Sequence, residues 1–145
     1  MKPRILLRIA AIALLLHDAG HSSQILLWTK TDDPAKQEVI RQMTMKYFPF
    51  MGASRSMGDG FEGFIWAASI AMLFFVVVLW IVSGDNQNPL ARKILIVTAV
   101  ILAGWWIVEL NYFFLFAAVN TFVVWLFILT ALFQLRNRTE VHPAL

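Results

Sequence analysis

The chain has 145 residues, of which 59% are hydrophobic, 14% aromatic and 14% charged, and its formal net charge is +3. A typical soluble domain has roughly 45–50% apolar and about 25% charged residues, so this composition excludes a disordered, collagen-like or coiled-coil chain and indicates a membrane protein. The absence of cysteine excludes disulfides, thiolate metal sites, iron–sulfur clusters and cysteine nucleophiles.

Four apolar segments are long enough to cross a bilayer, which needs about 20 residues of helix. The predicted spans are 9–28, 61–83, 94–115 and 117–135. The last two come from one apolar stretch that is too long for a single span, and a turn is expected near 116–120. The end of the first segment lacks the small-residue pattern of a cleaved signal peptide. We therefore expect an all-α bundle of four transmembrane helices, forming a single integral membrane domain over residues 1–145.

An outer loop, 29–60, is predicted between the first two spans. Asp33 and Pro34 form an N-cap followed by proline at the first helical position. The residues after them predict a short amphipathic helix that ends by Pro49, with an apolar stripe of Val39, Ile40, Met43 and Tyr47. Such a helix lies at the membrane interface, and packing over the mouth of the bundle fits the same pattern.

A glycine-rich segment leads from this helix into the second span. Ser56 and Asp59 have the spacing of a capping box, with Asp in the place of the usual Glu. Gly63, Ala67 and Ala71 repeat at four-residue intervals, which favours close contact between helices.

The distribution of basic residues predicts the orientation of the chain. Seven of them flank one side of the predicted membrane: Lys2, Arg4, Arg8, Arg92, Lys93, Arg136 and Arg138. Short loops rich in Lys and Arg remain in the cytoplasm. We therefore expect a multi-pass protein of the inner (cell) membrane with both termini and the tail 136–145 in the cytoplasm. The basic charge reflects this topology, and no stripe of cations and aromatics predicts a nucleic-acid partner.

Four ionisable residues lie deep inside predicted spans, away from the span ends, where a charge costs roughly 2.5–3.5 kcal/mol on insertion scales. They are His17, Asp18, His21 and Glu109. Polar groups from all four spans fall in the outer half of the membrane, which predicts an outward-facing polar site. The residues expected to bind a ligand there are Glu109, Glu62, Arg55, Asp59, Trp66, Trp105, Tyr112 and Asn120.

The sequence His17-Asp18-Ala19-Gly20-His21 has the spacing of the H-E-x-x-H zinc motif with Asp in the place of Glu. In a membrane helix it resembles the signature of site-2-type intramembrane metalloproteases. That resemblance implies a divalent metal such as zinc bound by His17 and His21, with Asp18 as the catalytic base. The third ligand would be Asp59, Glu62 or Glu109. A haem is disfavoured, because two His on one face of a helix cannot be the two axial ligands of one haem within a monomer, and a dimer would have to supply one His from each chain.

Over most of its length the chain resembles a group of small four-helix bacterial integral membrane proteins without an assigned activity. The resemblance rests on H-x-x-G-H in the first span and on FPFMGASRSMGDGFEGF before the second. It implies topology alone. The expected function is binding of a small ligand, lipid or metal at the polar site, with or without a reaction. The alternatives are a structural or accessory subunit with a buried polar network, a metal-dependent hydrolase, and a transporter protomer acting as a homo-oligomer.

Overall fold

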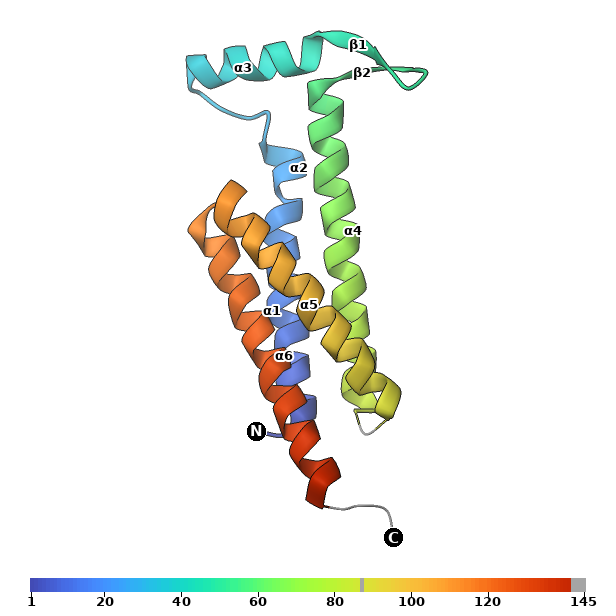
Figure 1. Ribbon diagram of the computed structural model, residues 1–145. Coiled ribbons are helices and arrows are strands. Elements are labelled where there is room, and N and C mark those ends of the chain that lie inside the picture. Colours follow the sequence, from blue (N-terminus) through green and yellow to red (C-terminus); the bar gives the residue numbers. More distant parts are fainter. Residues whose placement is uncertain (87, 142–145) are drawn as a thin grey trace. The chain divides into compact units, whose positions relative to one another are not determined.

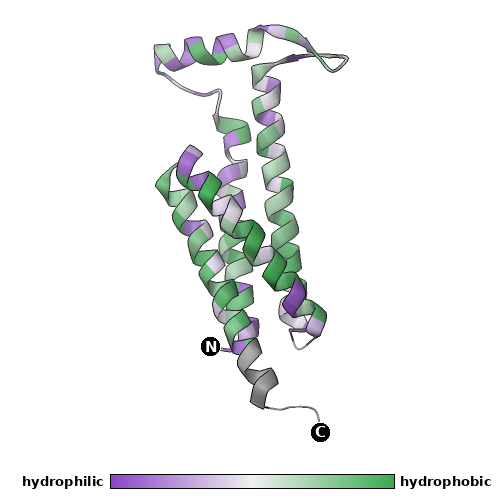
Figure 2. Ribbon diagram, in the orientation of Figure 1, coloured by the Kyte–Doolittle hydropathy of each residue, from purple (hydrophilic) through white to green (hydrophobic). Residues whose placement is uncertain are grey.

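The computed structural model describes residues 1–86 and 88–141 and is almost entirely helical (Figure 1). Its elements are α1 (Pro3–Ser22), α2 (Gln24–Leu27), α3 (Pro34–Met45), β1 (Tyr47–Phe50), β2 (Ala53–Ser56), α4 (Met57–Gly84), α5 (Pro89–Tyr112) and α6 (Leu115–Val141). Four helical stretches are long and apolar enough to cross a membrane: Pro3–Leu27, Met57–Gly84, Pro89–Tyr112 and Leu115–Leu135. Figure 2 shows hydrophobic residues along most of α4, α5 and α6. The expected all-α four-helix bundle is confirmed.

The helices begin earlier than predicted, because capping residues and prolines start them before the apolar segments do. The first stretch starts at Pro3 and not at residue 9, and it is interrupted at Ser23 between α1 and α2. The second starts at Met57, where the predicted capping box forms: the Ser56 amide donates to Asp59 Oδ2 at 2.8 Å and the Asp59 amide donates to Ser56 Oγ at 3.1 Å. Proline lacks the amide hydrogen that the first helical turn leaves unpaired, so it fits such starts.

The third and fourth spans are also shifted from their predicted bounds. α5 begins at Pro89 after the N-cap Asn88, whose side chain accepts a hydrogen bond from the Leu90 amide. The turn that follows α5 lies at Phe113 and Phe114, so its expected position at 116–120 was wrong. Phe113 is extended (φ −121°, ψ −171°), and neither Gly nor Pro marks the break. α6 continues to Val141, so residues 136–141 of the predicted tail are helical, and 142–145 lie outside the described residues.

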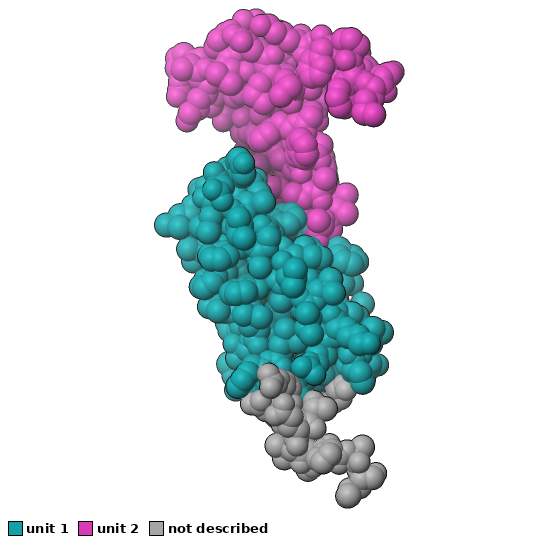
Figure 3. All heavy atoms as spheres, in the orientation of Figure 1, with its two compact units in different colours: residues 1–17, 72–145 teal, residues 18–71 magenta. Residues whose placement is uncertain are grey.

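The described residues form two compact units, shown in different colours in Figure 3. Unit 1 comprises residues 1–17 and 72–145, and unit 2 comprises residues 18–71. The core of unit 1 contains large side chains that are almost completely buried together with small residues at the close helix contacts. Its most buried members include Leu7, Leu14, Leu79, Leu95, Val124, Ile128, Ala10, Ala11 and Ala131.

Within unit 1, α5 and α6 lie side by side (Figure 1), and Trp125 Nε1 on α6 donates to the carbonyl of Ala99 on α5 at 3.0 Å. Arg8 of α1 contacts α4 in two ways. Its Nε donates to Ser83 Oγ at 3.4 Å, and its guanidinium lies 5.0 Å from the ring centre of Trp80. The cation is therefore accommodated by a hydroxyl and an aromatic face.

In unit 2, α3 crosses the N-terminal end of α4 (Figure 1). Asp33 caps α3 as predicted, with its side chain accepting from the amides of Ala35 and Lys36. A Cβ on Gly58 would lie 3.1 Å from Thr44 Cγ2 and 3.2 Å from Trp28 Cη2. Glycine at the start of α4 therefore permits the close approach of α3 and Trp28.

Two features of unit 2 differ from the sequence prediction. The segment that precedes α4 is an antiparallel hairpin of β1 and β2, in which Tyr47 pairs with Ser56 and Phe50 with Ala53. Its turn residues, Met51 (φ 47°) and Gly52 (φ 83°), have the positive φ angles that two-residue hairpin turns need. The expected close helix contact at Gly63 is not found among the described residues, since apart from its own helical turn no atom lies within 4 Å of where its Cβ would be.

Candidate functional site

The polar residues of unit 1 gather around Glu109, near the end of α5. Its carboxyl group is almost completely buried, with 3% of the residue exposed. Glu109 Oε1 accepts a hydrogen bond from Trp105 Nε1 at 3.0 Å and lies 3.4 Å from His17 Nε2. We call His17, Trp105, Glu109 and Thr121 the Glu109 cluster. It joins α1, α5 and α6 through side chains that come from distant parts of the sequence.

Both ring nitrogens of His17 face polar atoms of this cluster. Nε2 is directed to Glu109, and Nδ1 lies 3.5 Å from the hydroxyl of Thr121. The imidazole and the carboxylate form an ion pair when His17 is protonated. Thr121 is 1% exposed, and no pattern in the sequence indicates its role, because a Thr in an apolar helix can bond its own backbone instead.

The second oxygen of Glu109 stands out among the buried side-chain nitrogen and oxygen atoms. Oε2 has no hydrogen-bond partner among the residues that the structure describes. Leaving a buried acceptor unpaired costs about 1–3 kcal/mol, and more for a charged group. Because α5 ends at Tyr112, Glu109 also lies in the last helical turn, about 4.5 Å from the helix end at 1.5 Å per residue. A negative charge is unfavourable there, since the helix dipole places its own negative end at the C-terminus.

The polar residues of unit 2 form a separate set of contacts. Asp18, which is 4% exposed, accepts from Ser22 Oγ at 3.2 Å, and this hydroxyl lies 2.8 Å from Ser69 Oγ on α4. His21 Nε2 lies 3.3 Å from the carbonyl oxygen of Ile65, which can only accept, so the nitrogen donates. These bonds join the end of α1 to α4.

Glu62 has a partner in the same unit. Its Oε1 accepts from Trp28 Nε1 at 3.0 Å, and the Trp28 ring meets Phe61 edge-on with the ring centres 5.2 Å apart. Asp18, His21 and Glu62 are therefore all engaged within unit 2, whereas His17 and Glu109 belong to unit 1. A single site that combines His21 with Glu109 stays a prediction.

Several residues predicted to bind a ligand have other surroundings. Asp59 caps α4, and Arg55 is exposed on β2 with its guanidinium donating to the Ser54 carbonyl. Trp66 is 55% exposed and Tyr112 is 82% exposed, so neither joins a buried cluster. Asn120 Nδ2 donates to the carbonyl of Ala13 at 3.3 Å, which connects α6 to α1. Trp105 is the predicted aromatic that does contact Glu109.

The zinc motif does not assemble a ligand set in the part of the chain that is described. His17 faces Glu109 and Thr121, while His21 faces the Ile65 carbonyl. Among residues 1–86 and 88–141, no group of three or more His, Asp or Glu side chains is arranged to hold a metal ion. His142 lies outside the described residues. A catalytic zinc site requires three protein ligands, so the expected metal site of His17 and His21 with Asp18 as base lacks support.

The fold and the clusters define a helical protein with four candidate membrane spans and a buried acid–imidazole pair. No protein-family model, no curated protein and no solved structure matches this chain.

Proposed function

We propose that this protein is a multi-pass membrane protein that binds a small ligand at the Glu109 cluster. The observation that carries the proposal is the unpaired, buried Oε2 of Glu109. An ionised carboxylate accepts hydrogen bonds and donates none, so the matching ligand group is an N–H or O–H donor. The apolar helices around the cluster favour an apolar body for the rest of the ligand. Because Oε2 is enclosed, ligand entry requires a neighbouring side chain to move.

A pair of probes with opposite head groups tests this function. Octylamine offers a donor and a positive charge, whereas octanoate has a similar chain but offers a carboxylate. We expect octylamine to raise the thermal unfolding temperature of the detergent-purified protein and octanoate to leave it unchanged. Saturation at ten times the dissociation constant stabilises a folded protein by about 1.4 kcal/mol.

Two variants locate the binding. Glu109→Met should abolish the response to octylamine, because it removes the acceptor. Glu62→Gln is the matched control, since Glu62 is also a carboxylate in a span but is already bonded to Trp28. An equal response of wild type and Glu109→Met would refute ligand binding at the cluster.

A structural or accessory subunit is the second candidate function. It is favoured by hydrogen bonds that join helices within each unit, such as Ser22 to Ser69 and Asn120 to the Ala13 carbonyl. Polar bonds of this kind contribute about 0.6 kcal/mol each on average in membranes. If this were the whole role of the Glu109 cluster, removal of the carboxylate would destabilise the protein.

The orientation is part of the same proposal. The excess of Lys and Arg near both termini and between α4 and α5 supports termini on the cytoplasmic side of the inner membrane. Impermeant labelling of single cysteines introduced at Lys2 and at Lys30 in intact cells tests it. We expect the cysteine at position 30 to react and the one at position 2 to be protected, and the reverse pattern would overturn the orientation.

A further inference from the structure

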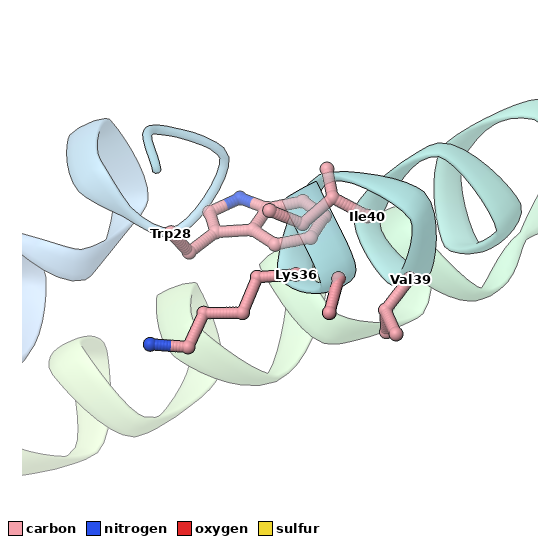
Figure 4. Close-up of a pocket in the computed structure, with 5 residues that line it drawn as sticks. Trp28, Lys36, Val39 and Ile40 are labelled. Atoms are coloured by element: carbon pink, nitrogen blue, oxygen red, sulfur yellow. The ribbon is translucent and has the colours of Figure 1, made fainter. Parts of the chain in front are cut away.

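One face of α3 carries two shallow apolar grooves, both in unit 2. The first has a volume of about 370 Å³ and contains the side chain of Lys36 beside the Trp28 ring (Figure 4). Its lining residues are Trp28, Ala35, Lys36, Val39 and Ile40. The second has a volume of about 430 Å³ and is lined by Val39, Gln42, Met43, Lys46, Phe48 and Met57. Val39 belongs to both, so the grooves adjoin, and each combines apolar side chains with one lysine.

The charges of α3 are divided between its two sides. Arg41, which lines neither groove, donates two hydrogen bonds of 2.7 Å to Glu38. Its charge is therefore neutralised locally, and this interaction lowers the pKa of Glu38 to about 2. On the groove side, Lys36 Nζ is 4.0 Å from Asp33 and 71% of the side chain is exposed. Lys46 has no carboxylate within 4.0 Å in the described part of the chain. The groove side therefore presents two accessible cations.

The hairpin next to the second groove adds exposed apolar side chains. Phe50 is 59% exposed and Met51 is 92% exposed. The chain passes from this hairpin directly into α4, whose length and composition suit a membrane span. Since α3 crosses the start of α4 within the same unit (Figure 1), the grooves and the hairpin lie at one end of a candidate membrane span.

We propose that the groove face of α3 binds an anionic phospholipid. Lys36 and Lys46 together attract the negatively charged head group of the lipid, and its acyl chain covers the apolar residues around Val39. Charge complementarity favours this occupant, because accessible lysines beside apolar surface attract anionic head groups, while the neutralised side of α3 remains in water. The proposal is independent of the Glu109 cluster.

Lipid titration of the full-length protein in detergent tests the proposal. Native mass spectrometry would compare the binding of phosphatidylglycerol with that of phosphatidylcholine carrying the same acyl chains. We expect the wild type to prefer phosphatidylglycerol. Lys36→Gln and Lys46→Gln should each weaken its binding about fivefold, and the double variant about 25-fold, from the typical contribution of one lysine at a membrane surface. Lys30→Gln is the matched control, because this exposed lysine lines neither groove and its loss should leave the affinity unchanged.

Further variants and competitors distinguish bound lipid from free phosphate and from a loss of folding. Val39→Asp should abolish the preference, because it places a negative charge in both grooves, and circular dichroism verifies that the variant is folded. Inorganic phosphate should not displace phosphatidylglycerol, and full displacement would show that the face recognises free phosphate. Equal binding of the two lipids by wild type, or undiminished phosphatidylglycerol binding by the double variant, would overturn the proposal. Glu109→Met should bind lipid like the wild type, so this test stands apart from that of the proposed function.

Discussion

Replacing Glu109 by methionine is expected to stabilise the protein. Met is an unbranched apolar side chain that fills irregular space in a core, so it replaces the carboxylate with little change of shape. The substitution removes an unpaired buried oxygen, which costs about 1–3 kcal/mol. It also removes a negative charge from the last turn of α5, which costs about 0.3–1 kcal/mol.

Two favourable contacts are lost at the same time. Trp105 Nε1 loses its acceptor, and His17 loses the carboxylate oxygen at 3.4 Å. Both side chains are only partly buried, unlike the carboxyl group, so an average polar contact in a membrane protein of about 0.6 kcal/mol applies to each and the loss is about 1.2 kcal/mol. The gains exceed it, and we expect a net stabilisation of about 1 kcal/mol. A residue that weakens the fold is retained for activity more readily than for structure.

Reversible unfolding in mixed micelles with increasing mole fraction of sodium dodecyl sulfate measures this difference. Asn111→Met is the control, because Asn111 is exposed in the same helical turn and its side chain bonds the carbonyl of Ile107 in its own helix. Destabilisation by Glu109→Met of more than about 1 kcal/mol, with the control unchanged, would refute the reasoning and favour the accessory-subunit function.

Four further predictions concern other parts of the chain. The carboxyl group of Glu38 should titrate with a pKa of about 2 and not 4.5, since Arg41 bonds its charged form. The pair then stabilises α3 above pH 4.5, and this stabilisation is lost as the pH falls through 2. Carbon NMR of the carboxyl group measures the pKa, which should return to the ordinary value in Arg41→Gln. Asp59→Ala should destabilise the protein by about 1 kcal/mol in chemical unfolding, because it breaks the cap of α4; an unchanged midpoint would contradict the cap. Gly52→Ala should increase proteolytic cleavage of the hairpin, because φ is +83° there, whereas equal cleavage rates would show that the turn tolerates a Cβ. Leu79→Ala should destabilise unit 1 by about 2–5 kcal/mol, since this side chain is fully buried, and a loss below about 1 kcal/mol would contradict its place in the core.

Features set by neighbouring residues were predictable. The four spans follow from runs of apolar residues, and the starts of α3 and α4 follow from Asp33 with Pro34 and from Ser56 with Asp59. The hairpin was missed because its aromatic and small residues, without the usual Asn-Gly turn, gave a weak strand pattern. The turn at Phe113 was misplaced because no Gly or Pro marks it.

The runs of apolar residues were enough to place His17, Asp18, His21 and Glu109 inside predicted spans. The groups that these side chains contact are set by the tertiary fold. At about 100° per residue, adjacent positions of one helix point in different directions. Asp18 therefore points away from the partners of His17 and bonds Ser22. His17 and His21 share a helix face but lie one turn apart, so His17 meets Glu109 and His21 bonds the Ile65 carbonyl. Partners separated by many residues leave no periodic pattern in the sequence, so these contacts could not be predicted. The spacing of His17 and His21 suits zinc, but in the structure each side chain contacts a different polar group of the protein.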